Sequence, residues 1–282
     1  MIPLRTRPEG TPLRAGRQVA ARLEFLNGPE GTYLADQLTP HPFHITRPFR
    51  IPDDPNGMAT LYLQSSSGGL YGDDNLSLSI RVGDEASAQV TTQASTVVHH
   101  ARGGVSRMCV DIHAADGAFV EYLPDPSILF AGARLVSSTT LCLAPGARAI
   151  LCDAVLGHDP EGKGDPFERL TGETNVMGPD GPLLYDHFDV DGRDWRARTR
   201  PWPCHASLAV AGDGAPAAAR SMRDALARLP DLWAGASAYA DRDISVARIL
   251  ATDGASLTNA LAMAWAAARM ALTGVAPRIR RK

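Results

Sequence analysis

The chain has 282 residues, a formal net charge of −3 at pH 7 and a hydrophobic fraction of 44%. This length allows a full hydrophobic core, as one large domain or two ordinary ones. The weak net charge gives no reason to expect a nucleic-acid partner. Residues 1–16 contain no apolar run, and the most apolar later stretch, 260–276, is interrupted by Arg269 and Gly274. We therefore expect neither a signal peptide nor a membrane span.

The cysteine pattern favours a cytoplasmic protein with reduced thiols. The four cysteines are widely spaced and form no CxxC pair. Such a pattern is not that of a disulfide framework or a zinc site, and free cysteines are usually small buried residues.

The predicted elements begin after a flexible N-terminal segment over residues 1–16, and residues 17–282 are predicted to form a single β-rich domain. A first strand is expected over Gln18–Leu26, and prolines then mark an irregular connection up to a second strand over Met58–Gln64. Further short β-type runs are separated by Gly, Asp or Pro turns. They cover Leu76–Val82, Ala88–Thr92, Thr96–Ala101, Met108–His113, Ala118–Leu123, Ala133–Leu143, Ala147–Leu156, Phe167–Val176, Leu183–Val190, Ala206–Val210 and Ile244–Leu250.

A faint internal repeat runs through the middle of the chain. Three strands end in small turns, at 82–86, 112–118 and 143–147, and each turn leads into a new strand. A recurrence of about thirty residues is typical of stacked β-layers, in which no single unit buries its apolar face alone. The fold class predicted is therefore mainly β, with stacked, solenoid-like sheets.

Two α-helices are expected at the C-terminal end. Residues 216–229 place alanine, methionine and leucine on one helical face before Pro230. Residues 256–273 form a second apolar face, with Ser256 as the predicted N-cap and Gly274 at the end. Both helices are expected to pack on the β-rich domain.

The stretch Gln64–His100 contains the first candidate site residues. Its glycine turn ends in Asp73 and Asp74, whose carboxylates could hold a cation; the alternative is a β-hairpin with Asp-rich turn chemistry. Thr92 and Gln93 end an apolar strand and could line a wet interior, or face solvent on an edge strand.

Histidines and acids beyond this turn complete the candidate set. Of His99 and His100, only one can face a given site on a strand, and imidazole suits borderline metals such as nickel; the alternative is a surface histidine. Glu121 and Asp125 end a strand in a proline-rich turn. Paired carboxylates also suggest a carbohydrate-active enzyme that uses Glu121 with Asp73 or Asp125. No P-loop and no GxSxG elbow is present in the sequence.

Several motifs together resemble the urease accessory protein UreD (UreH) family. They comprise Tyr62-Leu-Gln64 with Gly68-Gly69, Gly72 and Asp74, then Thr91-Thr92-Gln93, the Glu121–Ala133 segment, and the ending Ala276-Pro-Arg-Ile279. The likeness covers roughly residues 18 to 280. The chain departs from the family pattern at Asp73, where a glycine is usual, and at Val97 and His99, where a lysine and an aromatic residue are common.

The resemblance implies a non-catalytic urease maturation factor. Such a protein joins UreF, which recruits the GTPase UreG, and docks on apo-urease; a dimer of that complex is one assembly that the resemblance implies. Ni²⁺ would pass through an internal polar tunnel, with no tightly bound cofactor. Weak oxygen and nitrogen ligands suit such transit. The nickel path predicted here comprises Asp73, Asp74, Thr92, Gln93, His99, Glu121 and Asp125. An interaction scaffold without a metal path remains a further alternative.

Overall fold

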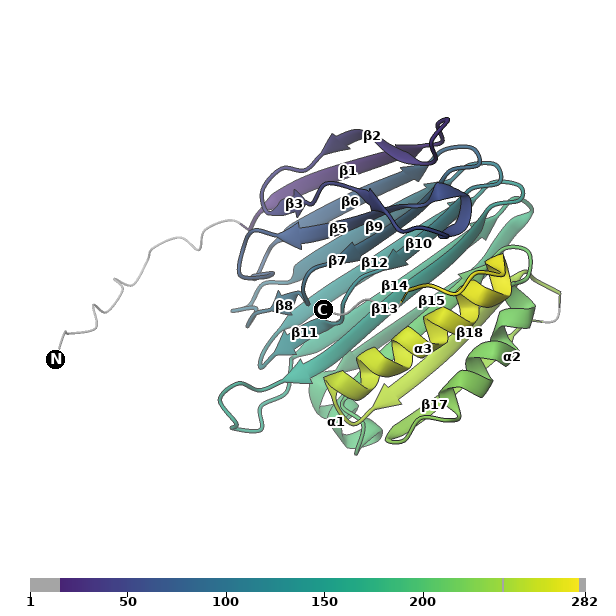
Figure 1. Ribbon diagram of the computed structural model, residues 1–282. Coiled ribbons are helices and arrows are strands. Elements are labelled where there is room, and N and C mark those ends of the chain that lie inside the picture. The colour runs from purple at the N-terminus through teal and green to yellow at the C-terminus, as the bar shows by residue number, and fades with distance from the viewer. Residues whose placement is uncertain (1–15, 240, 279–282) are drawn as a thin grey trace.

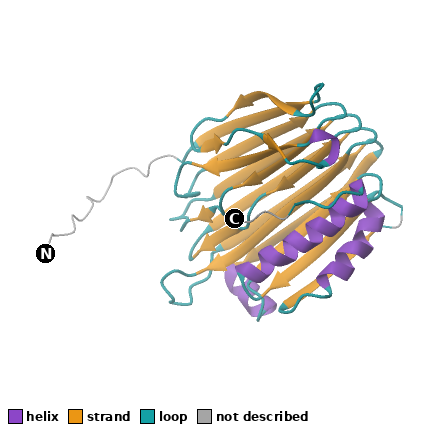
Figure 2. Cartoon of the chain, viewed as in Figure 1, coloured by secondary structure: helices purple, strands orange, loops and turns teal. Residues whose placement is uncertain are grey.

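The computed structural model describes residues 16–239 and 241–278, so the predicted flexible segment 1–16 lies, apart from its last residue, outside the described residues. Within the described residues the strands form two stacked sheets (Figures 1 and 2). In sheet A the strand order is β15-β14-β12-β9-β6-β1-β2. Its strands are β1 (Gln18–Leu26), β2 (Tyr33–Leu38), β6 (Asn75–Val82), β9 (Ser106–Ala114), β12 (Arg134–Leu143), β14 (Arg169–Gly178) and β15 (Gly181–Asp191).

In sheet B the main strand order is β17-β18-β16-β13-β10-β7-β5-β3, and the short strands β4, β8 and β11 pair at its side. The strands of sheet B are β3 (Phe43–Ile45), β4 (Phe49–Arg50), β5 (Ala59–Ser65), β7 (Ser87–Thr92), β8 (Val97–Val98), β10 (Phe119–Leu123), β11 (Ser127–Phe130), β13 (Arg148–His158), β16 (Cys204–Ala211), β17 (Leu232–Ala238) and β18 (Ile244–Ala251).

The chain alternates between the sheets through its middle section, as the predicted repeat requires. It passes from β5 to β6, β7, β9, β10, β12, β13 and β14, so that successive strands of one sheet are parallel neighbours. The turns at 83–86, 115–118 and 144–147 lie side by side: Glu85 N–H donates to Asp116 O at 2.9 Å, and Gly117 N–H to Pro145 O at 3.0 Å. The prediction of stacked, solenoid-like sheets is therefore confirmed.

The main hydrophobic core lies between the two sheets. Leu78 and Ile80 of β6 and Leu23 of β1 contribute to it and are almost completely buried, because alternate residues of these strands face inward. Strand β13 is buried on both faces, with Leu151 toward sheet A and Ile150 toward the helices. A strand covered on both sides reads as a continuous apolar run, as β13 does in the sequence.

Three α-helices complete the described residues: α1 (Gly192–Thr199), α2 (Ala215–Leu226) and α3 (Gly254–Thr273), with a short 3₁₀ turn, η1, at Pro55–Gly57. Figure 1 shows α2 and α3 side by side on the outer face of sheet B, over β16 and β18. Their apolar faces form a second core with β13, β16 and β18. The two predicted C-terminal helices are therefore confirmed, with shifted ends.

Several local predictions were wrong. The N-cap of α3 is Asp253, whose carboxylate accepts a hydrogen bond from Ser256 N at 2.8 Å, and α2 ends at Leu226. The sequence reading also missed α1, whose polar composition shows no apolar face, and β17, which is mostly exposed. The expected irregular connection before residue 58 contains β2, β3, β4 and η1, and the expected strand 96–101 shrinks to β8.

Candidate functional site

The glycine turn between β5 and β6 carries the chain from sheet B to sheet A, so it is not the β-hairpin that was one of its readings. Hairpin strands pair with each other, whereas these strands belong to different sheets. The turn is tightly packed: Gly69 has φ of +127°, and a Cβ there would lie 2.1 Å from Val97 O. Glycine is therefore required at this crossing by both conformation and space.

Asp74 anchors this crossing loop to the start of β1. It is 2% exposed and accepts hydrogen bonds from Arg17 N at 2.9 Å, Arg17 Nε at 3.0 Å and Tyr71 N at 2.8 Å. Burial raises the pKa of Asp74, but the bonds from Arg17 and Tyr71 outweigh burial and lower its pKa below 3.8. With its oxygens held by Arg17 and Tyr71, this carboxylate has a structural role in the geometry observed.

Asp73 and His99 meet in a surface pocket of about 580 Å³. Asp73 is exposed and accepts a hydrogen bond from Val105 N at 3.3 Å. The ring of His99 stacks on Tyr71 with centroids 4.4 Å apart, and its Nε2 lies 2.9 Å from Gly68 O. His100 has its Nδ1 occupied by Arg102 N, so the adjacent histidines make different contacts.

Glu121 lies in a buried ion-pair cluster beneath α3. It is completely buried, and both its oxygens are bound by Arg269, which is 1% exposed. Trp265 Nε1 donates to Glu121 Oε1 at 2.9 Å, and Arg269 also pairs with Asp54 at 2.8 Å. Burial lowers the pKa of Arg269, but the carboxylates raise it further, so the net shift is upward. These contacts join β10, α3 and the segment before η1.

This cluster also bears on the carbohydrate-enzyme alternative. A glycosidase acid must reach the glycosidic oxygen of a bound sugar, which requires an accessible carboxyl group. Glu121 has no exposed surface and is engaged by Arg269. The described geometry therefore gives this alternative no support.

A cavity of about 100 Å³ lies between the two sheets at the ends of β7 and β10, and two of the predicted residues line it. Thr92 and Asp125 reach it from sheet B, and Thr92 Oγ1 accepts a hydrogen bond from Asp125 N at 2.7 Å. β7 is flanked by β5 and β10, so the edge-strand reading of the Thr-Thr-Gln triplet is wrong. The next residue, Gln93, is exposed and accepts from Gln64 Nε2 at 2.9 Å.

Polar side chains that the sequence reading missed also line this cavity, among them Ser137 and Thr139 from β12 and Asp153 from β13. Burial is the main cause that raises the pKa of Asp153 to about 6, and nearby Asp186 adds to this effect, while Arg248 opposes it. In the sequence, the available signal for Asp153 as a cavity residue was a single acid inside the apolar run of β13. Because the run reads as a buried strand, only the partner sheet shows that its acid faces a cavity.

The structure thus separates the predicted nickel path into distinct places. Thr92 and Asp125 share the inter-sheet cavity, Asp73 and His99 share the surface pocket, and Asp74 and Glu121 are paired with arginines. Among the described residues no three His, Cys, Asp or Glu side chains are grouped so as to hold a metal ion.

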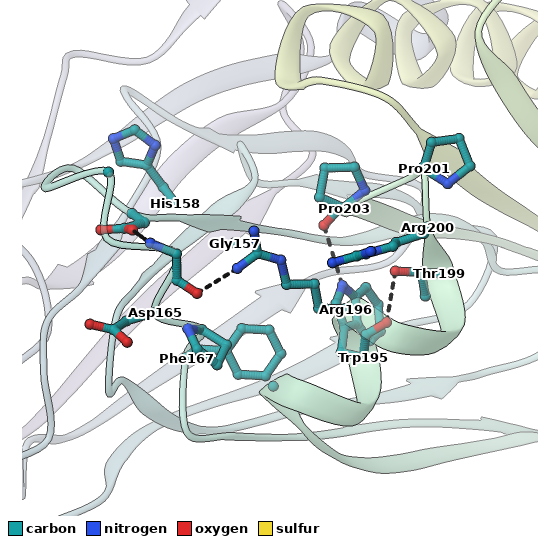
Figure 3. A pocket seen from close by; sticks show the side chains of 15 residues that line it. Gly157, His158, Asp165, Phe167, Trp195, Arg196, Thr199, Arg200, Pro201 and Pro203 are labelled. Atoms are coloured by element: carbon teal, nitrogen blue, oxygen red, sulfur yellow. Dashed lines mark hydrogen bonds between the residues drawn. The ribbon is translucent and has the colours of Figure 1, made fainter.

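A second surface pocket, of about 520 Å³, lies between α1 and the loop after β13 (Figure 3). Arg196 of α1 donates to Gly164 O, which joins α1 to the loop across the pocket, and Trp195 Nε1 donates to Pro203 O at 3.3 Å in the segment after α1. None of the predicted path residues lines this pocket.

Known proteins resemble this chain over nearly its whole length. The model of the UreD urease accessory protein family matches residues 17–282. The chain is 40% identical to urease accessory protein UreD 1 of Methylorubrum extorquens (strain PA1), over 95% of this chain and 92% of the relative. It is 38% identical to UreD 1 of Pseudomonas syringae pv. tomato (strain ATCC BAA-871 / DC3000), over 94% and 96%, respectively. It is 36% identical to UreD 3 of Bradyrhizobium sp. (strain ORS 278), over 95% and 96%.

The fold and the cavity define a two-sheet β-solenoid protein, covered on one face by two helices and enclosing polar side chains between its sheets. No helix in the described part of the chain has the length and apolar character to cross a bilayer. The chain belongs to the UreD family of urease accessory proteins. Its membership gives it a role in urease maturation.

Proposed function

We propose that this chain serves urease maturation as a non-catalytic scaffold in the cytoplasm, which docks on apo-urease and passes nickel from UreF and UreG to the urease active site. The ion would move through the polar cavity between the two sheets. The observation that carries the proposal is this cavity, where polar side chains from both sheets line a space at one end of an otherwise apolar core. A dimer of the complex with UreF and UreG is part of the same proposal.

The lining chemistry suits an ion in transit. Ser137, Thr139 and Thr92 offer hydroxyl oxygens, and Asp125 and Asp153 offer carboxyl groups. Single oxygen ligands bind nickel more weakly than a closed set of thiolates and imidazoles, so the ion is released readily. A cation beside Asp153 would also favour its charged form, which burial disfavours.

The proposal assigns different roles to the other predicted residues. Asp73 and His99 are proposed to contact the ion at the surface, and Gln93 at the neighbouring loop. Asp74 and Glu121 are proposed to hold the scaffold together, since each is buried against an arginine. Releasing either carboxylate for nickel would leave Arg17 or Arg269 without its main partner.

Adjacent serines on β12 provide a matched test. Ser137 lines the cavity, whereas Ser138 pairs with Cys109 and Glu173 in a row on the opposite face of sheet A. We expect Ser137→Trp to fill the cavity and lower the nickel content and activity of urease activated in a reconstituted mixture with UreF, UreG and Ni²⁺. Ser138→Trp should leave both at the wild-type level.

The controls are the fold, by circular dichroism, and assembly with the partners, by size-exclusion chromatography. Normal activation by a folded Ser137→Trp variant would contradict the nickel path and favour a scaffold that only joins its partners. Equal losses of urease nickel content and activity with Ser137→Trp and Ser138→Trp would contradict the nickel path as well. Asp125→Asn and Asp153→Asn then test the carboxylates, with a lower rate of nickel transfer expected in each.

A further inference from the structure

Three metal-binding side chain types form a row across the outer face of sheet A. His113 of β9 pairs with Cys142 of β12, and Cys142 pairs with Met177 of β14. The residues on both sides of His113 and Cys142, and the residue before Met177, face the inter-sheet core and are almost fully buried: Ile112, Ala114, Leu141, Leu143 and Val176. Because successive side chains of a strand point to opposite faces, His113, Cys142 and Met177 all point outward.

All three side chains are available at the surface. His113 is exposed, Met177 is 38% exposed and Cys142 is partly buried. Neither His113 nor Cys142 makes a side-chain hydrogen bond or an ion pair with any other residue that the structure describes. A thiol between an imidazole and an exposed thioether is not explained by packing, since none of the three side chains fills the core.

The spacing permits a shared ion. Neighbouring strands lie about 4.7–4.9 Å apart, so side chains paired across them can converge above the sheet. Thiolate–metal and imidazole–metal bonds are about 2.3 and 2.0 Å long, respectively. An ion above Cys142 is therefore within reach of His113 on one side and Met177 on the other.

The donor set selects the ion. Thiolate and thioether sulfur are soft ligands that favour Cu(I), and imidazole also binds copper. Zinc in structural sites takes four ligands of the Cys, His, Asp or Glu kinds. Among the described residues no three side chains of those kinds are grouped for a metal, so the row supplies two such ligands and a thioether. This low-coordinate, sulfur-rich set suits Cu(I) better than Zn²⁺.

We propose that His113, Cys142 and Met177 form a surface binding site for Cu(I). On binding, the Cys142 thiol releases its proton to solvent and the thiolate becomes the central ligand, with the His113 imidazole and the Met177 thioether on either side. The site lies on the opposite face of sheet A from the cavity that Ser137 and Thr139 line. It is therefore independent of the nickel path proposed above.

The test is a competition for Cu(I) between the full chain and bicinchoninate, under anaerobic conditions with ascorbate. We expect the wild-type chain to withdraw a single equivalent of Cu(I) and to develop thiolate-to-copper charge-transfer absorption. Cys142→Ser should abolish both signals. His113→Gln and Met177→Leu, which preserve the size of each side chain, should each weaken competition while retaining the absorption.

Cys109 provides the matched control, because it also faces outward, on β9, but its strand neighbours are Ser77 and Ser138. Cys109→Ser should bind Cu(I) as the wild type does. If Cys109→Ser lost as much Cu(I) binding as Cys142→Ser, copper would bind exposed thiols in general, and the proposed site would be overturned. Wild-type affinity in His113→Gln and Met177→Leu together would also overturn it, as a lone thiolate would then suffice.

Discussion

Substitution of Arg269 by methionine tests the buried ion cluster that joins α3 to sheet B. Arg269 is 1% exposed, and its partners Glu121 and Asp54 are 0% and 2% exposed in their side chains. Methionine keeps much of the volume but removes the only positive charge of this cluster. Two carboxylates would then remain buried, and Glu121 would keep only the hydrogen bonds that Gln89 and Trp265 donate to it in the described structure.

The expected loss in the free energy of unfolding is about 3–5 kcal/mol, the usual cost of removing one partner of a buried ion pair. Urea denaturation followed by circular dichroism measures it. Arg278→Met is the matched control. Arg278 pairs at the surface with Asp53, the residue before Asp54, and their side chains are 65% and 86% exposed. Exposed pairs contribute about 0–1 kcal/mol, so this control should change stability little.

A double variant separates the loss of attraction from the cost of the stranded charge. Glu121→Gln keeps the shape of the side chain and removes one negative charge. If the stranded carboxylate causes the loss, Arg269→Met combined with Glu121→Gln should be more stable than Arg269→Met alone. A double variant that is no more stable, or an Arg269→Met loss no larger than that of Arg278→Met, would refute this reasoning.

Three further predictions concern acids and a glycine. Because the pKa of Asp153 is raised from 3.8 to about 6, its proton is bound more tightly in the native state, and stability should fall as pH rises through this window; Asp153→Asn should remove that slope from urea denaturation curves. The pKa of Asp74 is lowered in the folded state. Its contribution to the free energy of unfolding is therefore present above pH 3.8 and is lost as the pH falls through its lower folded-state pKa. Asp74→Asn should lower stability at neutral pH and flatten this acid-side loss; an unchanged slope would contradict either assignment. Gly69→Ala should cost about 1–3 kcal/mol through strain, whereas Gly235→Ala, with open space around it, should be neutral in the same thermal denaturation assay.

Local patterns predicted much of the scaffold. β1 was predicted with its observed bounds, because its alternation of apolar and polar residues continues over the whole strand. The three small turns were predicted from a recurrence of glycine and alanine, and the structure stacks them. The exposed strand β17 and the polar helix α1 show no such periodicity, so their formation depends on pairing with β18 and on packing at the end of β15.

Candidate site residues were harder to predict than strands. Asp74 and Glu121 looked like free acids in the sequence, since their arginine partners are 57 and 148 positions away. Thr92 and Asp125 were predicted to line a polar interior and do line the inter-sheet cavity. Whether nickel passes there stays a prediction.

The sequence by itself determined the class of fold and the family, because alternation, turn chemistry and the motifs around Gly68–Asp74 and Glu121–Ala133 are local properties of the chain. Only the tertiary structure decided which polar residues serve the scaffold and which face a cavity. Parallel strands of a solenoid pair residues from successive repeats, so the partners of Asp153, Glu121 and Cys142 are set by the stacking of sheets and helices. The electrostatic surroundings of each acid therefore follow from the assembled layers.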